Sequence, residues 1–222
     1  MDLLETNNAG KVRDLLENAK HIAIIPSKVA GADSYCAAAG LFHMLLQDER
    51  PVTLIHTGKV PEICEGLVDK ELITSDIKSR ELMVTIDYSN TPAARVHYFT
   101  ENDVLTLKLS PVDKDFDFSR IRAHLAGFNF DVVITLGVLE NDDLGQTYHE
   151  LENELRAARI INVDNNKSNS LHGYVNVIDN MADNLSMVVY KNAALWGLSP
   201  NTKSAKALLT GMTYKEPRVD KS

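Results

Sequence analysis

The residues of this sequence best suited to chemistry are a carboxylate and two amides, Asp164, Asn165 and Asn166, which follow the apolar segment 160–163. The Ile and Val residues of that segment are typical of a strand buried in a parallel sheet. In open α/β sheets, ligands bind outside the carboxyl ends of the strands. Carboxylate oxygens ligate divalent cations there, and amide oxygens do so more weakly. We therefore expect these three residues to lie at a ligand-binding edge.

Two other apolar segments, 21–26 and 131–136, are expected to end at the same edge. The first is followed by a loop with Ser27 and Gly31, and then by Asp33, where a helix should begin. The second ends at Gly137. Asp33 is as well suited to cap the helix as to ligate a metal ion. Asn165 and Asn166 are of a residue type that is common in turns, which is the alternative to a role as ligands.

Hydrophobic periodicity predicts the elements that position these residues. Alternating strands and helices at the start of the chain imply a parallel sheet with right-handed crossovers. The fold class that we expect is α/β, a Rossmann-like parallel sheet flanked by helices. The expected helices are 9–19, 33–47, 60–68, 120–126, 144–158, 183–196 and 201–210, and the expected strands are 21–26, 51–56, 131–136, 159–163 and 174–178.

The middle of the chain has a different pattern. Segments 81–87, 94–99 and 104–109 read as strands, and residues 100–103 between the last two have the composition of a hairpin turn. We interpret residues 80–115 as a β-rich insertion in a single domain of residues 1–215, followed by a polar tail at 216–222. Exposed edge strands in the insertion could pair with another chain, so a homodimer is one of the expected oligomeric states.

Composition excludes several classes of function. The chain has 222 residues and a net charge of -8, which argues against binding of bulk duplex nucleic acid. Two cysteines indicate no disulfide framework and favour a reducing, cytoplasmic setting. The N-terminus lacks the basic start of a signal peptide, and no apolar run reaches the roughly 18 residues that span a bilayer, so we expect no membrane association.

Four motifs, in order, resemble those of the DHH (RecJ-like) phosphoesterase family. Residues 27–34 and their small-residue helix resemble His-x-Asn-Pro-Asp-x-Asp-Ala, with Ser27 at the histidine, Gly31 at the first aspartate and Asp33 retained. The family's second motif is an aspartate that ends an apolar strand and precedes Leu-Gly. In this sequence Gly137 stands at the position of that aspartate. A rival placement on 83–89 would keep an acid, Asp87.

The third and fourth motifs lie nearer the C-terminus. Asp164-Asn165-Asn166 stands where the family has Asp-His-His, with Asn169 and Gly173 following. Residues 208–212, Leu-Leu-Thr-Gly-Met, resemble the family's Leu-Leu-Thr-Gly-Ile, but Lys215 stands near the expected acid. The resemblance implies a DHH-type N-terminal domain. Family enzymes carry a second, substrate-binding domain after this point. We expect that domain to be lacking here, and the alternative is that the natural chain is longer than this sequence.

The resemblance also implies a pair of Mn²⁺ or Mg²⁺ ions that activate water in the family enzymes. Only Asp33 and Asp164 remain to balance four positive charges, so we expect no metal ligand beyond these two, no catalytic residue and no cofactor. Lys28, Lys167 and Lys215 fall near the same loops. One of them could pair with Asp33 or Asp164 and leave a phosphate contact, or all three could be solvated surface lysines.

These observations lead to one interpretation and two alternatives. The chain is expected to be a degenerate, catalytically inactive phosphoesterase-like domain that acts as a binding or assembly module for a protein partner or a short nucleotide. The first alternative is a metal-dependent phosphoesterase of the oligoribonuclease or nucleotide phosphatase type, with Mn or Mg ligands added by Asp87, Asp179 or a partner chain. The second is an unrelated Rossmann-like domain, in which Asp33, Gly137 and Asp164 would not surround one cleft.

Overall fold

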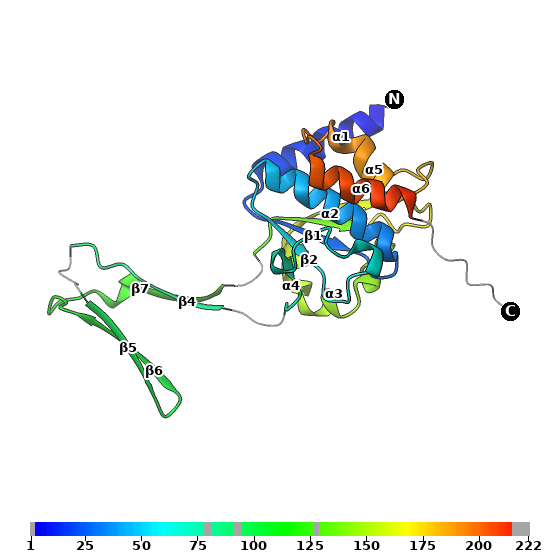
Figure 1. Ribbon diagram of the computed structural model, residues 1–222. Helices are drawn as coiled ribbons and strands as arrows, with labels where there is room; N and C mark the ends of the chain where they lie inside the picture. The colour runs from blue at the N-terminus through cyan, green and yellow to red at the C-terminus, as the bar shows by residue number, and fades with distance from the viewer. Residues whose placement is uncertain (1–2, 78–80, 91–94, 127–128, 215–222) are drawn as a thin grey trace. The chain divides into compact units, whose positions relative to one another are not determined.

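The chain forms two compact units, residues 1–79 with 128–222 and residues 80–127. The computed structural model describes residues 3–77, 81–90, 95–126 and 129–214 (Figure 1). Each unit is described separately below. Among the described helices, none is long and apolar enough to cross a membrane.

The larger unit is built on a six-stranded sheet in which every pair of neighbours is parallel. Its order is β10-β9-β8-β1-β2-β3. The predicted α/β class with a parallel sheet is therefore confirmed. The strands are β1 Ile22–Pro26, β2 Val52–Ile55, β3 Ile73–Thr74, β8 Val132–Leu136, β9 Arg159–Asp164 and β10 Val175–Ile178.

Helices cover both faces of this sheet (Figure 1). Alternate residues of β1 enter different cores, because side chains alternate across a strand. Ile22 and Ile24 pack in the core with the first face's helices, whereas Ala23 and Ile25 pack on the other side. The first face carries α1 Leu3–Asn18, α2 Gly31–Gln47, α5 Leu185–Ala193 and α6 Thr202–Thr213, and the second carries α3 Gln146–Glu150 and α4 Glu152–Ala157.

Small residues in α2 allow α6 to approach closely. A Cβ added at Gly40 of α2 would lie 2.5 Å from Leu208 Cδ2 of α6. The Ala-rich stretch 37–39 beside it is fully buried. This close packing of helices fixes the start of α2, and with it Asp33, against the sheet.

The sheet reverses its strand order between β1 and β8, because the chain passes from β1 to β2 and β3 on one side and later from β8 to β9 and β10 on the other. Such a switch point is where open α/β sheets leave a crevice at the carboxyl ends of the strands. Ser27 follows β1 and Gly137 follows β8, so both lie beside this point.

The smaller unit contains two antiparallel ribbons. One pairs β4 Glu81–Ile86 with β7 Ile121–Ala126, and the other pairs β5 Arg95–Glu101 with β6 Val104–Ser110. The β5–β6 turn has Asn102 at φ 48° and Asp103 at φ 61°, as a two-residue hairpin turn with two left-handed positions requires. The predicted hairpin is therefore confirmed, although Ala94, where we expected its first strand to begin, lies outside the described residues.

Three predicted helices differ from the structure. Residues 121–126 form strand β7, because Ile121, Ala123 and Leu125 alternate with polar residues and pair with β4. The β-rich unit consequently extends to residue 127 rather than 115. In the segment 60–68 only Glu62–Cys64 is helical, as the 3₁₀ turn η1. The segment 144–158 is interrupted at Leu151, between α3 and α4.

The remaining short elements are 3₁₀ turns. They are η2 Lys70–Leu72, η3 Phe118–Arg120 and η4 Asn141–Leu144. The polar tail that we predicted at 216–222 lies outside the described residues.

Candidate functional site

Three neighbouring strands bring the predicted site residues to one edge of the sheet. The backbone N–H of Ser27 donates to Leu136 O at 2.8 Å, and that of Gly137 donates to Val163 O at 2.9 Å. The loops after β1, β8 and β9 are thus joined side by side. Ser27, Gly137 and Asp164 follow one another across this edge, which is the arrangement that the resemblance required.

Asp33 lies in the first turn of α2 and holds the N-terminus of α5. Its carboxylate accepts hydrogen bonds from the backbone N–H groups of Leu185 at 2.7 Å and Ser186 at 3.3 Å, and from Ser186 Oγ at 3.4 Å. The first N–H groups of a helix have no partner within the helix and carry partial positive charge. Asp33, although it lies in the first turn of α2, therefore stabilises the N-terminus of the distant helix α5.

Leu185 also closes the space beside Gly137. A Cβ at Gly137 would lie 2.7 Å from Leu185 Cδ1 and 2.8 Å from Ala30 Cβ. Gly137 adopts φ +66°, a conformation that L residues rarely adopt. A side chain at this position, the family's aspartate included, does not fit this conformation of the chain.

Asp164 is a buried carboxylate, 2% exposed, whose oxygens are held by nitrogen donors. Oδ1 accepts the backbone N–H groups of Asn165 at 2.7 Å and Asn166 at 3.1 Å. Oδ2 accepts from Asn169 Nδ2 at 2.7 Å. Buried carboxylates need such partners, because desolvation of an isolated charge is costly.

A chain of asparagine side chains supports Asp164 from behind. Asn162 Nδ2 donates to Asn169 Oδ1 at 2.7 Å and to Asn176 Oδ1 at 2.9 Å. Asn169 Nδ2 also donates to Val138 O at 2.9 Å. Asn162 was not among the site residues predicted from the sequence motifs. Its signal was an amide in the middle of an apolar strand, since a fully buried amide requires partners.

The remaining polar residues of the edge are used in local turns. Asn165 Nδ2 donates to Ala182 O at 3.1 Å, and Asn166 Oδ1 accepts from Ser168 N at 2.9 Å. Ser27 Oγ accepts from Val29 N at 3.1 Å and Ala30 N at 3.2 Å. Gly31, at φ +60°, begins α2.

The three predicted lysines do not share one position. Within the described residues, no ion pair involves Lys28 or Lys167, and both are exposed. Lys28 Cε lies 3.5 Å from the position of a Cβ at Gly58, towards β2. Lys215 lies outside the described residues.

The two acids invoked for the metal-dependent alternative have other partners. Asp87 follows β4 in the smaller unit, where its carboxylate accepts from Ser89 Oγ at 2.6 Å and Ser89 N at 2.9 Å, and these hydrogen bonds lower its pKa. Asp179 forms an ion pair with Lys191 at 2.8 Å, which lowers the pKa of Asp179. Since β8, and not β4, lies between β1 and β9, the topology favours Gly137 as the second motif position.

The donor set at this edge does not fit a metal pair. Among the residues that the structure describes, no group of three or more His, Cys, Asp and Glu could hold a metal ion. The two carboxylates that remain, Asp33 and Asp164, both accept hydrogen bonds from N–H donors.

Comparisons with known proteins agree with the fold. No protein-family profile and no curated protein sequence matches the chain. In structure it is similar to an exopolyphosphatase-related protein from Bacteroides fragilis, with a TM-score of 0.63 and 13% sequence identity. The match covers 93% of this chain and 49% of that protein, so the chain spans about half of its length. This similarity shows the α/β fold of the chain.

Proposed function

We propose that this chain is a DHH-like phosphoesterase domain that has lost catalysis and acts as a binding or assembly module. The observation that carries the proposal is the pairing of Asp33 with the N-terminus of α5. A helix terminus with about half a positive charge replaces a divalent cation as the partner of this carboxylate. Gly137, closed by Leu185, removes a second ligand position.

Charge balance supports the same conclusion. Two divalent ions bring four positive charges, and catalysis by a metal pair depends on ligands that fix both ions. Asp33 and Asp164 supply two negative charges at this edge, and neutral amides stand at the two histidine positions. Buried cysteines without a disulfide, Cys36 and Cys64, support the proposed reducing, cytoplasmic setting.

The competing function is metal-dependent hydrolysis of an oligoribonucleotide or a nucleotide. The name of the structural neighbour, an exopolyphosphatase-related protein, favours it. It would require added ligands from a partner chain or from a rearrangement that releases Asp33 from α5.

Calorimetric titration with Mn²⁺, together with a dinucleotide hydrolysis assay on the same sample, separates the two functions. We expect no saturable binding and no Mn²⁺-dependent turnover. Any weak heat should be unchanged in the Asp164→Asn variant. Binding of two ions with turnover that Asp164→Asn abolishes would establish the phosphoesterase instead.

The smaller unit supplies a surface for assembly. In the β5–β6 ribbon, the cross-strand pairs Val96–Leu109 and Tyr98–Leu107 share one face. Val96 is 68% exposed and Tyr98 is 77% exposed. An isolated two-stranded ribbon is only marginally stable in water, and three or more strands with a hydrophobic face, or packing against a helix, are needed for independent stability.

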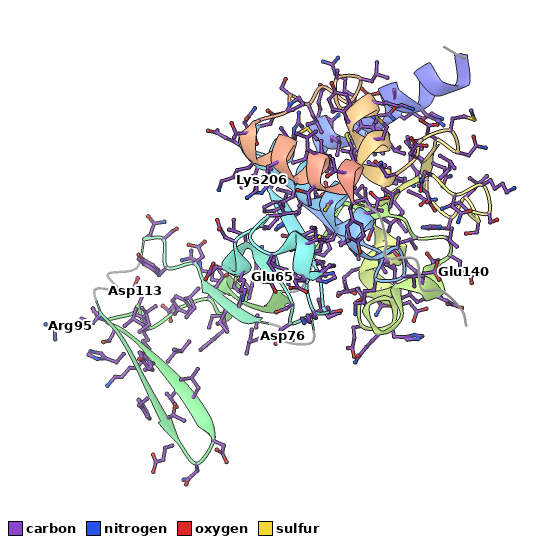
Figure 2. The ribbon with its side chains drawn as sticks, turned by 45° about the vertical axis from the view of Figure 1, so that its right-hand side comes forward. Glu65, Asp76, Arg95, Asp113, Glu140 and Lys206 are labelled. Atoms are coloured by element: carbon purple, nitrogen blue, oxygen red, sulfur yellow. The ribbon has the colours of Figure 1, made fainter. Side chains whose placement is uncertain are left out.

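We infer that the partner of this ribbon is a second copy of the chain. Within the described residues, β5 pairs only with β6, so its outer edge carries unpaired backbone groups. Arg95 and Glu101 lie at its opposite ends, equally far from Tyr98 (Figure 2 labels Arg95). Antiparallel pairing of two β5 strands about Tyr98 would place each Arg95 opposite the other copy's Glu101. The product is a four-stranded sheet.

The phosphate or short-nucleotide site of this module is proposed for the edge formed by Ser27, Gly137 and Asp164. Lys28 and Lys167 are the described cations of its loops. Their exposure leaves both ammonium groups free to turn towards an anion.

A further inference from the structure

The two cysteines of the chain lie next to each other in the core of the larger unit. Their Sγ atoms are 3.5 Å apart, although 28 positions separate Cys36 of α2 from Cys64 of η1. Cys36 is fully buried, Cys64 is 1% exposed, and both are free thiols. A disulfide has an S–S length of about 2.05 Å, so the two sulfurs need to approach by about 1.5 Å to form one.

The two cysteines differ in how firmly their backbone is held. Cys36 lies inside α2, a helix of 17 residues that packs closely on α6. Cys64 ends a 3₁₀ turn of three residues, and its neighbour Glu65 is exposed (Figure 2 labels Glu65). Among the described residues, no atom beyond the chain neighbours of Gly66 lies within 4 Å of a Cβ there. The segment 62–66 is therefore the side that can move towards α2, and local opening of this short turn exposes Cys64 to a small oxidant.

The two thiols also differ in reactivity. The hydrogen bond between the sulfurs lowers the pKa of Cys64, and burial opposes that effect. The same hydrogen bond, together with burial, raises the pKa of Cys36. Cys36 therefore keeps its proton and donates the hydrogen bond to the sulfur of Cys64. Cys64 is the better nucleophile of the two, because thiolates rather than thiols attack oxidants.

We propose that Cys36 and Cys64 form a reversible disulfide when the chain meets a peroxide, and that this bond fastens the segment 62–66 to α2. Cys64 attacks first: its sulfur bonds to one oxygen of hydrogen peroxide, the O–O bond breaks and water leaves, which gives a sulfenic acid on Cys64. Cys36 then attacks that sulfur, the S–S bond forms, the S–O bond breaks and a second water leaves. In total the two thiols lose two electrons and two protons, and hydrogen peroxide is reduced to two waters.

The helix that carries Cys36 begins at the proposed binding edge. Cys36 lies one turn after Asp33 on α2, and Asp33 holds the start of α5. The disulfide thus attaches the connection between β2 and β3, which contains Cys64, to this helix. Thiol–disulfide exchange with a small thiol reverses the step. The proposal does not depend on loss of catalysis, since neither thiol is a residue of that edge.

The test is treatment of the reduced full chain with hydrogen peroxide, followed by alkylation of the remaining thiols and a non-reducing tryptic peptide map. Trypsin cuts after Lys28, Lys59 and Lys70 but not before a proline, so the two thiols fall in different peptides, 29–59 and 60–70. We expect these two peptides to be joined, with no thiol left to alkylate, and dithiothreitol to separate them. Because the bond constrains the unfolded chain, the oxidised protein should also melt about 5–10 °C higher than the reduced protein.

Cys36→Ala and Cys64→Ala are the variants that remove one partner. Each keeps one thiol, so neither should show joined peptides within one chain or a rise in melting temperature after peroxide. Both retain all six methionines, so they also control for methionine oxidation. Thermal unfolding of the reduced variants confirms that each one folds.

The peptide map of the unchanged chain needs no variant, so it decides the question even where a variant is unstable. A non-reducing gel shows whether the bond lies within one chain. Thiols that are still alkylated after peroxide, a sulfinic acid on Cys64 without joined peptides, or a disulfide between two copies of the chain would each overturn the proposal.

Discussion

The Asp33 carboxylate accepts a 2.7 Å hydrogen bond from the backbone N–H of Leu185, 152 positions further along the chain. The contact joins the start of α2 to the start of α5 across the carboxyl edge of the sheet. In the family that the sequence resembles, an aspartate of this motif stands beside metal ions. Here the same side chain stabilises a helix terminus. Asp33 therefore has a structural role in this chain, whereas the resemblance implied a role as a metal ligand.

Replacement of Asp33 tests this role. Asp33→Ala removes the partner of the Leu185 and Ser186 N–H groups, so the free energy of unfolding in urea should fall by about 2 kcal/mol. Asp33→Asn keeps an acceptor and should cost about half as much. Asp14→Asn, on an exposed position of α1, should change stability by less than about 0.5 kcal/mol. Equal effects of Asp33→Ala and Asp14→Asn would show that the cap contributes nothing.

Introducing an acid at Gly137 should damage the fold rather than create a metal site. Gly137→Asp places a Cβ within 2.8 Å of Ala30 Cβ at a positive φ, and we expect a loss of about 2 kcal/mol or more. Gly10→Ala is the control, because no atom lies within 4 Å of a Cβ there. It lies inside α1 and should stabilise the chain by about 1 kcal/mol. A Gly137→Asp protein of unchanged stability that binds Mn²⁺ would contradict this account.

Asn169 is expected to be the most sensitive amide of the network. It donates to Asp164 Oδ2 and to Val138 O and accepts from Asn162 Nδ2. Asn169→Ala leaves a buried carboxylate with fewer partners, and we expect a loss of about 3 kcal/mol in thermal or urea unfolding. Asn166→Ala, in an exposed turn, should cost less than about 1 kcal/mol. The order of these two losses, rather than their size, is the decisive result.

The dimer proposal predicts a charge-reversal pattern. Arg95→Glu should weaken self-association about tenfold. In the symmetric dimer each copy's residue 95 lies opposite the other copy's Glu101, so the single substitution creates two like-charged pairs. The double variant Arg95→Glu with Glu101→Arg should recover self-association. The control Lys11→Glu, on α1, changes the net charge by the same amount as Arg95→Glu and should leave self-association unchanged. Sedimentation velocity over a range of concentrations measures the result. A chain that stays monomeric at every concentration, or a double variant that is not rescued, would exclude pairing through β5.

Protonation of Asp131 at acidic pH should lower the free energy of unfolding. Burial raises its pKa, but the N–H groups of Lys20 and His21, each at 2.7 Å, outweigh that effect and leave the pKa lowered. A carboxyl with a lowered pKa stabilises the fold above its unfolded pKa of about 4 and loses that contribution as pH falls through the folded value. Asp131→Asn should therefore flatten the pH dependence of stability below about pH 4.

Sequence periodicity predicted the α/β sheet because its strands are short, apolar and separated by amphipathic helices. It misassigned residues 121–126, because Ile121 and Leu125 satisfy helical spacing as well as strand alternation and only the pairing with β4 decides between them. The edge of Ser27, Gly137 and Asp164 follows from the order of the motifs. The partner of Asp33 did not follow, because a contact between α2 and α5 depends on tertiary packing.

The most direct test of the proposed loss of catalysis is anomalous diffraction from crystals soaked in Mn²⁺. We predict no manganese peak beside Asp33 or Asp164, with the Leu185 N–H still on the Asp33 carboxylate. One or two peaks within coordination distance of these carboxylates, with α5 displaced from Asp33, would contradict the account and indicate a metal site of the kind that catalysis by a metal pair requires.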